Sequence, residues 1–330
     1  MKNFFLLPSA MLALLFPAAV LADDPVTGMA EFSVFGKVDL AGLAKGNIRT
    51  AAGAPMSTAR YLSVQSCFVI PQPPARVIEA MKRFDPTAHR ELKVYLHTDL
   101  PASPSAASFA RLNNPPDNGA VRALISATQK MSPELQISHA EAQKNSSGQP
   151  GLAFWIDILA RRAQSFVAGG AAAEAPYDES GTTIQPGKEL AGLVRQQAKV
   201  DRQFGGFLAS TGLIGGKGSL RPELYWELLE VEDEGVLTLG ASYQRATAGG
   251  GFQTADGLYY ASGGYNVNLT LHQLWPVQIS GRASTLVWRG DLTSAASLGD
   301  LHGIERLASE GAMRKDILKA ATIFQREAGR

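Results

Sequence analysis

The chain has 330 residues, of which 45% are hydrophobic and 18% are charged, and its formal net charge is +1. This composition supplies ample material for a core and excludes general disorder. The near balance of acidic and basic residues, with no run of five like charges, argues against a nucleic-acid-binding protein, which would show a basic excess or stripe.

Residues 1–22 have the pattern of a secretory signal peptide. Lys2 supplies a positive end, residues 4–15 form a mostly apolar run, and residues 20–22 form a small-residue cleavage site before Asp23. An uncleaved membrane anchor is the alternative, but two prolines break the apolar run. We therefore expect a periplasmic or secreted protein of bacterial type, with no membrane span in the mature chain.

The first part of the mature chain predicts an extension followed by a strand–helix–strand unit. Residues 23–58 form the extension, with a weak edge strand at 29–40 and a loop at 47–58. Residues 60–70 read as a strand, which contains the lone Cys67 as a buried structural thiol. The sequence Pro-Gln-Pro-Pro stops this strand and starts a helix, whose apolar face is Val77, Ile78, Met81 and Phe84. A second strand follows at 91–97.

The middle of the chain, from about 100 to 215, predicts a helical insertion. The clearest amphipathic helix in the chain is at 152–167. The remaining elements expected there are a loop at 100–118, a helix at 120–129, a short strand at 134–141, helices at 188–198 and 200–211, and a glycine cluster at 212–218.

After residue 221 the hydrophobic period changes to two, which predicts strands at 224–231, 236–245, 258–262, 265–275 and 277–291. In the clearest of these, one face carries Tyr265, Val267, Leu269 and Leu271, and the other carries Asn266, Asn268, Thr270 and His272. One dry face and one wet face are typical of antiparallel pairing.

The last segment, 300–330, predicts one long amphipathic helix. Gly311 separates two apolar sets at helical spacing, so we expect the helix to bend there or to let a ligand approach closely. A helix of this length needs a partner surface. We expect it to cover the dry face of the strands before it.

This order of elements resembles the START-related helix-grip superfamily, which includes lipid-transfer and polyketide-cyclase-like domains. The resemblance rests on VQSCFVIPQPPARVIEAMKRFDP (64–86) and on STLVWRGDLTSA (284–295), which leads into the terminal helix. It implies an α+β fold in which a curved antiparallel β-sheet wraps around a long C-terminal helix, here as a single domain at 59–330 with a helical insertion. It also implies a small hydrophobic or amphipathic ligand held between sheet and helix, and transient membrane contact is compatible with such a ligand. The superfamily has no universal catalytic residues.

The strand block and the terminal helix supply the side chains expected to line a cavity, although core packing of the same residues is the alternative. These residues are Trp226, Tyr243, Tyr260, Tyr265, Val267, Leu269, Leu271, Val287, Ile304 and Gly311.

No catalytic, metal or cofactor signature is present in the sequence. There is no G-x-S-x-G elbow, no complete P-loop and no paired-histidine metal spacing. His97 and Asp99 read as a polar pair at a strand end, with a shared metal as the alternative. An exported binding or transfer protein for a lipid-like ligand is the main hypothesis. An enzyme (a cyclase or hydrolase) using His272, Glu227 or Arg289, or an interaction module docking through 152–167, are the alternatives.

Overall fold

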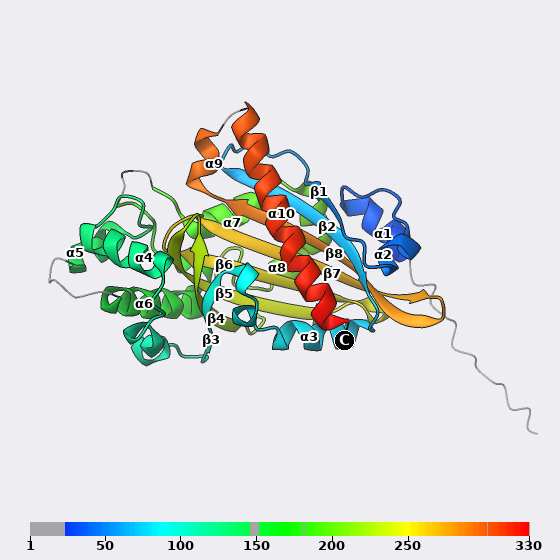
Figure 1. Cartoon of the computed structure of the whole chain (residues 1–330), viewed down its shortest axis with the longest axis horizontal. Helices are drawn as coiled ribbons and strands as arrows, with labels where there is room; N and C mark the ends of the chain where they lie inside the picture. The colour runs from blue at the N-terminus through cyan, green and yellow to red at the C-terminus, as the bar shows by residue number, and fades with distance from the viewer. Residues whose placement is uncertain (1–23, 146–151, 180, 182, 302, 330) are drawn as a thin grey trace, which may run out of the picture.

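The computed structural model describes residues 24–145, 152–179, 181, 183–301 and 303–329. Eight strands form one curved, antiparallel sheet in the order β1-β2-β8-β7-β6-β5-β4-β3 (Figure 1). The strands are β1 (Arg49–Ala52), β2 (Tyr61–Ile70), β3 (Val94–Leu100), β4 (Glu223–Val231), β5 (Glu234–Ala246), β6 (Phe252–Ala261), β7 (Val267–Ile279) and β8 (Arg282–Ser294). With the helices on both faces, this makes the chain an α+β protein, as predicted.

Two tight turns set the register of the long hairpins. Glu232 and Asp233, between β4 and β5, have φ values of 51° and 68°. Ser280 and Gly281, between β7 and β8, have φ values of 50° and 76°. Positive φ at both central residues gives a turn whose twist matches that of the paired strands.

The helical insertion covers one face of the sheet. It contains the 3₁₀ helices η3 (Ala106–Asn113) and η4 (Ala171–Ala173), and the α-helices α4 (Gly119–Lys130), α5 (His139–Asn145), α6 (Ala153–Gly169), α7 (Pro186–Arg195) and α8 (Ala198–Leu208). Trp155 and Leu159 of α6 lie in the same buried core as Val267, Leu269 and Leu271 of β7. The dry face of β7 therefore packs against the insertion.

The terminal helix α10 (Gly303–Ala328) lies across the opposite face of the sheet (Figure 1). It contacts β1, β2 and α3 (Pro74–Arg83). Ala321 and Phe324 pack there with Phe68 of β2 and Val287 of β8. The short helix α9 (Ala296–Asp300) precedes α10, and α10 continues as one helix through Gly311.

The expectation that the terminal helix covers the dry face of β7 is wrong. Leu274 of β7 packs with Ala321 and Phe324 of α10. Alternate residues of a strand point to opposite faces, so Leu269 and Leu271 face away from α10. The insertion presents the larger apolar surface, with Ile158 and Leu159 of α6 and Leu193 of α7 in the core. The insertion therefore covers the apolar face of the sheet.

The N-terminal extension is helical, not a strand at 29–40. It forms α1 (Pro25–Phe32) and α2 (Leu40–Ala44). Asp24 caps α1, because its carboxylate accepts a hydrogen bond of 3.1 Å from the Thr27 N–H. Phe32 packs edge-on against Trp288, with 4.8 Å between the ring centroids. Of the two weakly alternating apolar residues that suggested a strand, Phe32 makes this contact, whereas Val34 is 39% exposed.

Three further predictions are wrong at the level of single elements. Strand β1 lies inside the segment expected to be a loop at 47–58, and α5 occupies part of the segment expected to be a strand at 134–141. Strand β7 does not end at Trp275 but continues through Pro276, which pairs with Thr285.

A buried charged cluster ties α6 to the rest of the insertion. Arg162 Nη2 donates a hydrogen bond of 2.6 Å to Glu141, and Arg162 Nη1 lies 3.5 Å from Glu174. The guanidinium stands 4.4 Å from the ring centroid of Tyr260. Neither carboxyl oxygen of Glu174 has a hydrogen-bond partner among the described residues. Burial raises the pKa of Glu174 to about 8 against the opposing charge of Arg162, so its carboxyl is largely protonated at neutral pH.

Candidate ligand-binding site

The sheet face on the α10 side is polar in its middle. Strands β6, β7 and β8 are in register there, so that Thr254, His272 and Arg289 form one row. Neighbouring strands lie about 4.8 Å apart, so the members of a row are within reach of one another. Asp256, Thr270 and Asp291 form the next row, and Tyr225, Glu227 and His97 extend the surface onto β4 and β3. We call these nine residues the polar face.

A nearly buried ion pair lies at the centre of the polar face. Arg289 donates hydrogen bonds to Asp291 from Nε (2.8 Å) and from Nη2 (2.6 Å). The Thr270 hydroxyl donates a third, of 3.1 Å, to the same carboxylate, whose side chain is only 3% exposed. This two-point contact fixes the guanidinium plane. Arg289 Nη1 has no hydrogen-bond partner among the described residues, so it remains available for a ligand.

A tyrosine–carboxyl pair lies beside it. The Tyr225 hydroxyl donates a hydrogen bond of 2.6 Å to Asp256 Oδ1. The Tyr225 ring reaches β6 across Gly240, where an added Cβ would lie 2.2 Å from the ring. Burial raises the pKa of Asp256 to about 6, although the hydrogen bond from Tyr225 lowers it. Asp256 can therefore exchange a proton near neutral pH.

Two histidines occupy the polar face in different ways. His97 Nδ1 lies 2.8 Å from Glu227 Oε1. Burial lowers the pKa of His97, but the hydrogen bond and charge of Glu227 outweigh it, and the net shift is upward. His272 Nδ1 lies 3.0 Å from the Thr254 hydroxyl. Burial and then the charge of Arg289 lower the pKa of His272 to about 3, so this imidazole is neutral at pH 7.

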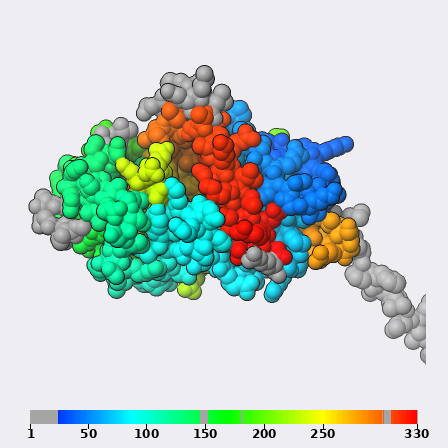
Figure 2. Space-filling view, viewed as in Figure 1, coloured from blue at the N-terminus to red at the C-terminus, as the bar shows by residue number. Residues whose placement is uncertain are grey.

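A hollow lies beside α10, on the side of the sheet that carries the polar face. Figure 2 shows this hollow between α10, α9 and the β4–β5 hairpin. On this side of the sheet, Asp256, Thr270 and His272 are partly exposed. Apolar side chains gather between the sheet, α9 and α10 next to it: Leu62, Tyr265, Leu298, Leu301 and Met313. This side of the sheet thus combines a polar surface with an apolar cluster.

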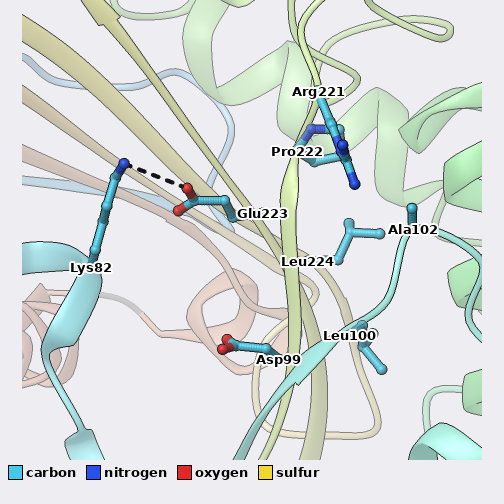
Figure 3. Close-up of a pocket in the computed structure, with 8 residues that line it drawn as sticks. All are labelled: Lys82, Asp99, Leu100, Ala102, Arg221, Pro222, Glu223 and Leu224. Carbon is cyan, nitrogen blue, oxygen red and sulfur yellow. Dashed lines mark ion pairs between the residues drawn. The ribbon is translucent and has the colours of Figure 1, made fainter.

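Two clefts open at the end of β4. The first has a volume of about 540 Å³, and its walls carry charges of both signs (Figure 3). It is lined by Lys82, Asp99, Leu100, Ala102, Arg221, Pro222, Glu223 and Leu224, and we call it the charged cleft. Lys82 points toward Glu223 at 3.9 Å, but both side chains are largely exposed, so the pair contributes little stability.

The second cleft, of about 300 Å³, shares Ala102, Arg221, Pro222 and Leu224 with the charged cleft. Its other lining residues are Val167, Gly212, Lys217, Gly218, Ser219, Leu220 and Tyr243, and we call it the apolar cleft.

The residues expected to line a cavity under the terminal helix do not lie together in the structure. Trp226 packs against Phe109 and donates a hydrogen bond to the Ser108 carbonyl, and Tyr260 lies under Arg162. The apolar side chains of β7 face the insertion. Five of the expected residues (Trp226, Tyr260, Val267, Leu269 and Leu271) are therefore core residues on the wrong face, because the sheet is inverted relative to the expectation.

The other expected residues have separate positions. Val287 and Tyr265 lie on the α10 side of the sheet. Tyr243 lines the apolar cleft. No atom of the described residues lies within 4 Å of a Cβ placed on Gly311, so among them this turn of α10 has open space beside it. The side chain of Ile304 lies outside the described part of the chain.

His272, Glu227 and Arg289, the residues considered for acid–base chemistry, all lie on the polar face. His272 and Arg289 are direct neighbours on β7 and β8, but Glu227 is three strands away on β4. Sequence reasoning missed Asp256, Asp291 and Tyr225. The alternation of Phe252, Thr254 and Asp256 could have placed Asp256 in a strand. The predicted strand began only at residue 258, because Asp256-Gly257 resembles a turn, whereas β6 begins at Phe252. His97 and Asp99 are a loose pair, with 3.8 Å between Nε2 and Oδ1. Within the described ranges, no group of three or more His, Cys, Asp or Glu residues could hold a metal ion.

No protein-family model, curated protein or solved structure matches this chain. Among the helices of the described residues, none is both long enough and apolar enough to cross a membrane.

Proposed function

We propose that this chain is an exported binding or transfer protein whose ligand lies in the hollow between the polar face and α10. The ligand is amphipathic. Its polar group meets Arg289 and Asp256, and its apolar part lies along Tyr265 and Met313. The class of ligand is therefore narrower than the lipid-like molecule expected from the sequence: the ligand needs a polar group, because the sheet beside α10 is polar.

The half-buried, incompletely paired polar face carries this proposal. Removing Arg289 and Asp256 from water is costly unless their hydrogen bonds are replaced. Each nevertheless keeps one polar atom without a partner among the described residues, on the side of the sheet where the hollow lies. Ionisable groups with shifted pKa values gather at functional sites, and a mixed polar and apolar lining is typical of ligand pockets.

A helix-grip fold is part of the proposal. Strand β2 leads into α3 through prolines. The strand that precedes the terminal helices, β8, pairs with every residue of β2. The two segments that carry the resemblance are thus neighbours in space. The contacts of α10 with β1, β2 and α3 support a terminal helix that closes over one side of the sheet.

Binding of a fluorescent single-chain lysophospholipid tests the proposal. We expect saturable binding, and we expect Arg289→Met combined with Asp291→Leu to weaken it at least tenfold, because the variant replaces the central ion pair with apolar side chains. Arg161→Met combined with Asp157→Leu is the matched control, because it removes an ion pair of 3.5 Å on α6, which packs against the other face of the sheet. Absence of saturable binding, or unchanged binding in the double variant, would refute the proposal.

An enzyme is the second candidate, because His272, Glu227 and Arg289 share one face with Asp256, whose pKa of about 6 suits proton transfer. Hydrolysis of p-nitrophenyl esters that is lost in Asp256→Asn and Glu227→Gln would favour this reading. The interaction-module alternative required an exposed apolar surface at 152–167. It is not supported, because the apolar residues of α6 are buried in the core.

A further inference from the structure

The apolar cleft lies on the insertion side of the sheet, away from the polar face. Leu224 and Tyr243 belong to the core shared by the sheet and the insertion, and Val167 stands near the end of α6. The Gly212 N–H donates a hydrogen bond of 3.0 Å to the Tyr243 hydroxyl, which fixes the ring in the wall. A volume of about 300 Å³ is at the lower end for ligand pockets, so the cleft suits a small molecule.

The wall formed by residues 212–218 is held by direct backbone packing. The Ala171 and Ala172 N–H groups donate hydrogen bonds to the carbonyls of Gly212 (2.8 Å) and Gly215 (3.0 Å). A Cβ added to Gly218 would lie 2.3 Å from the backbone of Ser210. Only glycine permits this approach, so the cleft has a defined shape before any ligand arrives.

The charge around the apolar cleft is positive. Lys217 and Arg221 are exposed at its edge, and no ion pair of either is found in the part of the chain that the structure describes. None of the residues that line the apolar cleft is acidic. The acidic side chains nearby, Asp99 and Glu223, line the charged cleft, where Glu223 faces Lys82.

We propose that the apolar cleft is a second binding site, for a small amphipathic carboxylate. Its apolar body lies against Leu220, Leu224 and Tyr243, and its carboxylate is held by Arg221 and Lys217. A guanidinium can bind a carboxylate through two parallel hydrogen bonds, and a lysine adds a point charge. An uncharged molecule of the same shape would lack these ion pairs, so the site favours the anion.

Calorimetric titration with octanoate tests this proposal. Octan-1-ol keeps the eight-carbon alkyl chain of octanoate but has no charge. Inorganic phosphate is charged but has no alkyl chain. We expect octanoate to bind at least tenfold more tightly than either, and its affinity to fall as salt is added. Arg221→Met with Lys217→Met should weaken octanoate binding at least tenfold, whereas Lys199→Met, an exposed lysine on α8, should leave it unchanged.

Leu220→Trp provides an independent variant, because it fills the cleft and leaves both cations in place. We expect it to block octanoate, with circular dichroism and the melting temperature confirming that each variant is folded. Failure of octanoate to bind the wild-type protein, or equal binding by the charge variant, would overturn the proposal. Loss of octanoate binding in Arg289→Met with Asp291→Leu, but not in Leu220→Trp, would move the ligand to the hollow and also overturn it.

Discussion

Gly240→Ala is the perturbation that most sharply probes the construction of the polar face. An added Cβ would lie 2.2 Å from Cζ and 2.5 Å from the hydroxyl of Tyr225, so the ring must leave its place across β5. This displacement breaks the 2.6 Å hydrogen bond to Asp256. We expect a loss of about 1–3 kcal/mol from overpacking. The lost hydrogen bond to an ionised group adds about 1.5–3 kcal/mol at pH 8.

Tyr225→Phe separates these two contributions, because it removes the hydrogen bond without a clash. Urea denaturation at pH 8 should show a smaller loss for Tyr225→Phe than for Gly240→Ala. The pKa of Asp256, followed by NMR of the carboxyl carbon, should rise above about 6 in both variants, since the hydrogen bond from Tyr225 lowers it. Gly206→Ala is the control, because Gly206 lies in α8 with open space around its Cα. Gly240→Ala with wild-type stability and an unchanged Asp256 pKa would refute this reasoning.

Three further predictions concern other parts of the chain. The pKa of Glu174 is about 8 in the folded state and 4.5 is its ordinary value, so the folded state retains a proton that the unfolded state loses. The free energy of unfolding, measured by urea denaturation, should therefore fall as pH rises from 4.5 to 8. Glu174→Gln should flatten this pH dependence, and an unchanged slope in the variant would contradict the prediction. Burial raises the pKa of the Cys67 thiol to about 12, so iodoacetamide should label it only in denaturant, and rapid labelling of the native protein would show that the thiol is accessible. The signal-peptide pattern predicts a mature chain that begins at Asp23, which N-terminal sequencing of exported protein checks; an intact Met1 would contradict it.

Periodicity predicted much of the fold. The strand β2, the proline-started helix α3, helix α6 and the alternating strands after residue 221 are all present. The helices and the later strands each bury a face that their own sequence marks, and β2 is a continuous apolar run that is buried on both faces. The lone cysteine is buried, as its apolar surroundings indicated. The N-terminal helices were missed because their few apolar residues, such as Phe32, are placed by tertiary contacts with Trp288 and not by a local pattern.

The pairing of faces could not be predicted from the sequence. The alternation in β7 correctly separates Leu269 and Leu271 from Thr270 and His272, but it does not say which layer covers which face. Two apolar helical surfaces compete for the dry face, and the insertion has the larger one. The polar face needed long-range register as well, since Asp256, Thr270 and Asp291 come from three strands.

Mass spectrometry of the protein purified from the periplasm or medium tests the central claim most directly. The account predicts that, under native conditions, the protein carries a small amphipathic molecule, which solvent extraction releases. This molecule is absent from Arg289→Met with Asp291→Leu and is retained by Leu220→Trp. A wild-type protein with only its polypeptide mass, together with no saturable binding of the lysophospholipid, would contradict the claim that the hollow beside α10 holds a ligand.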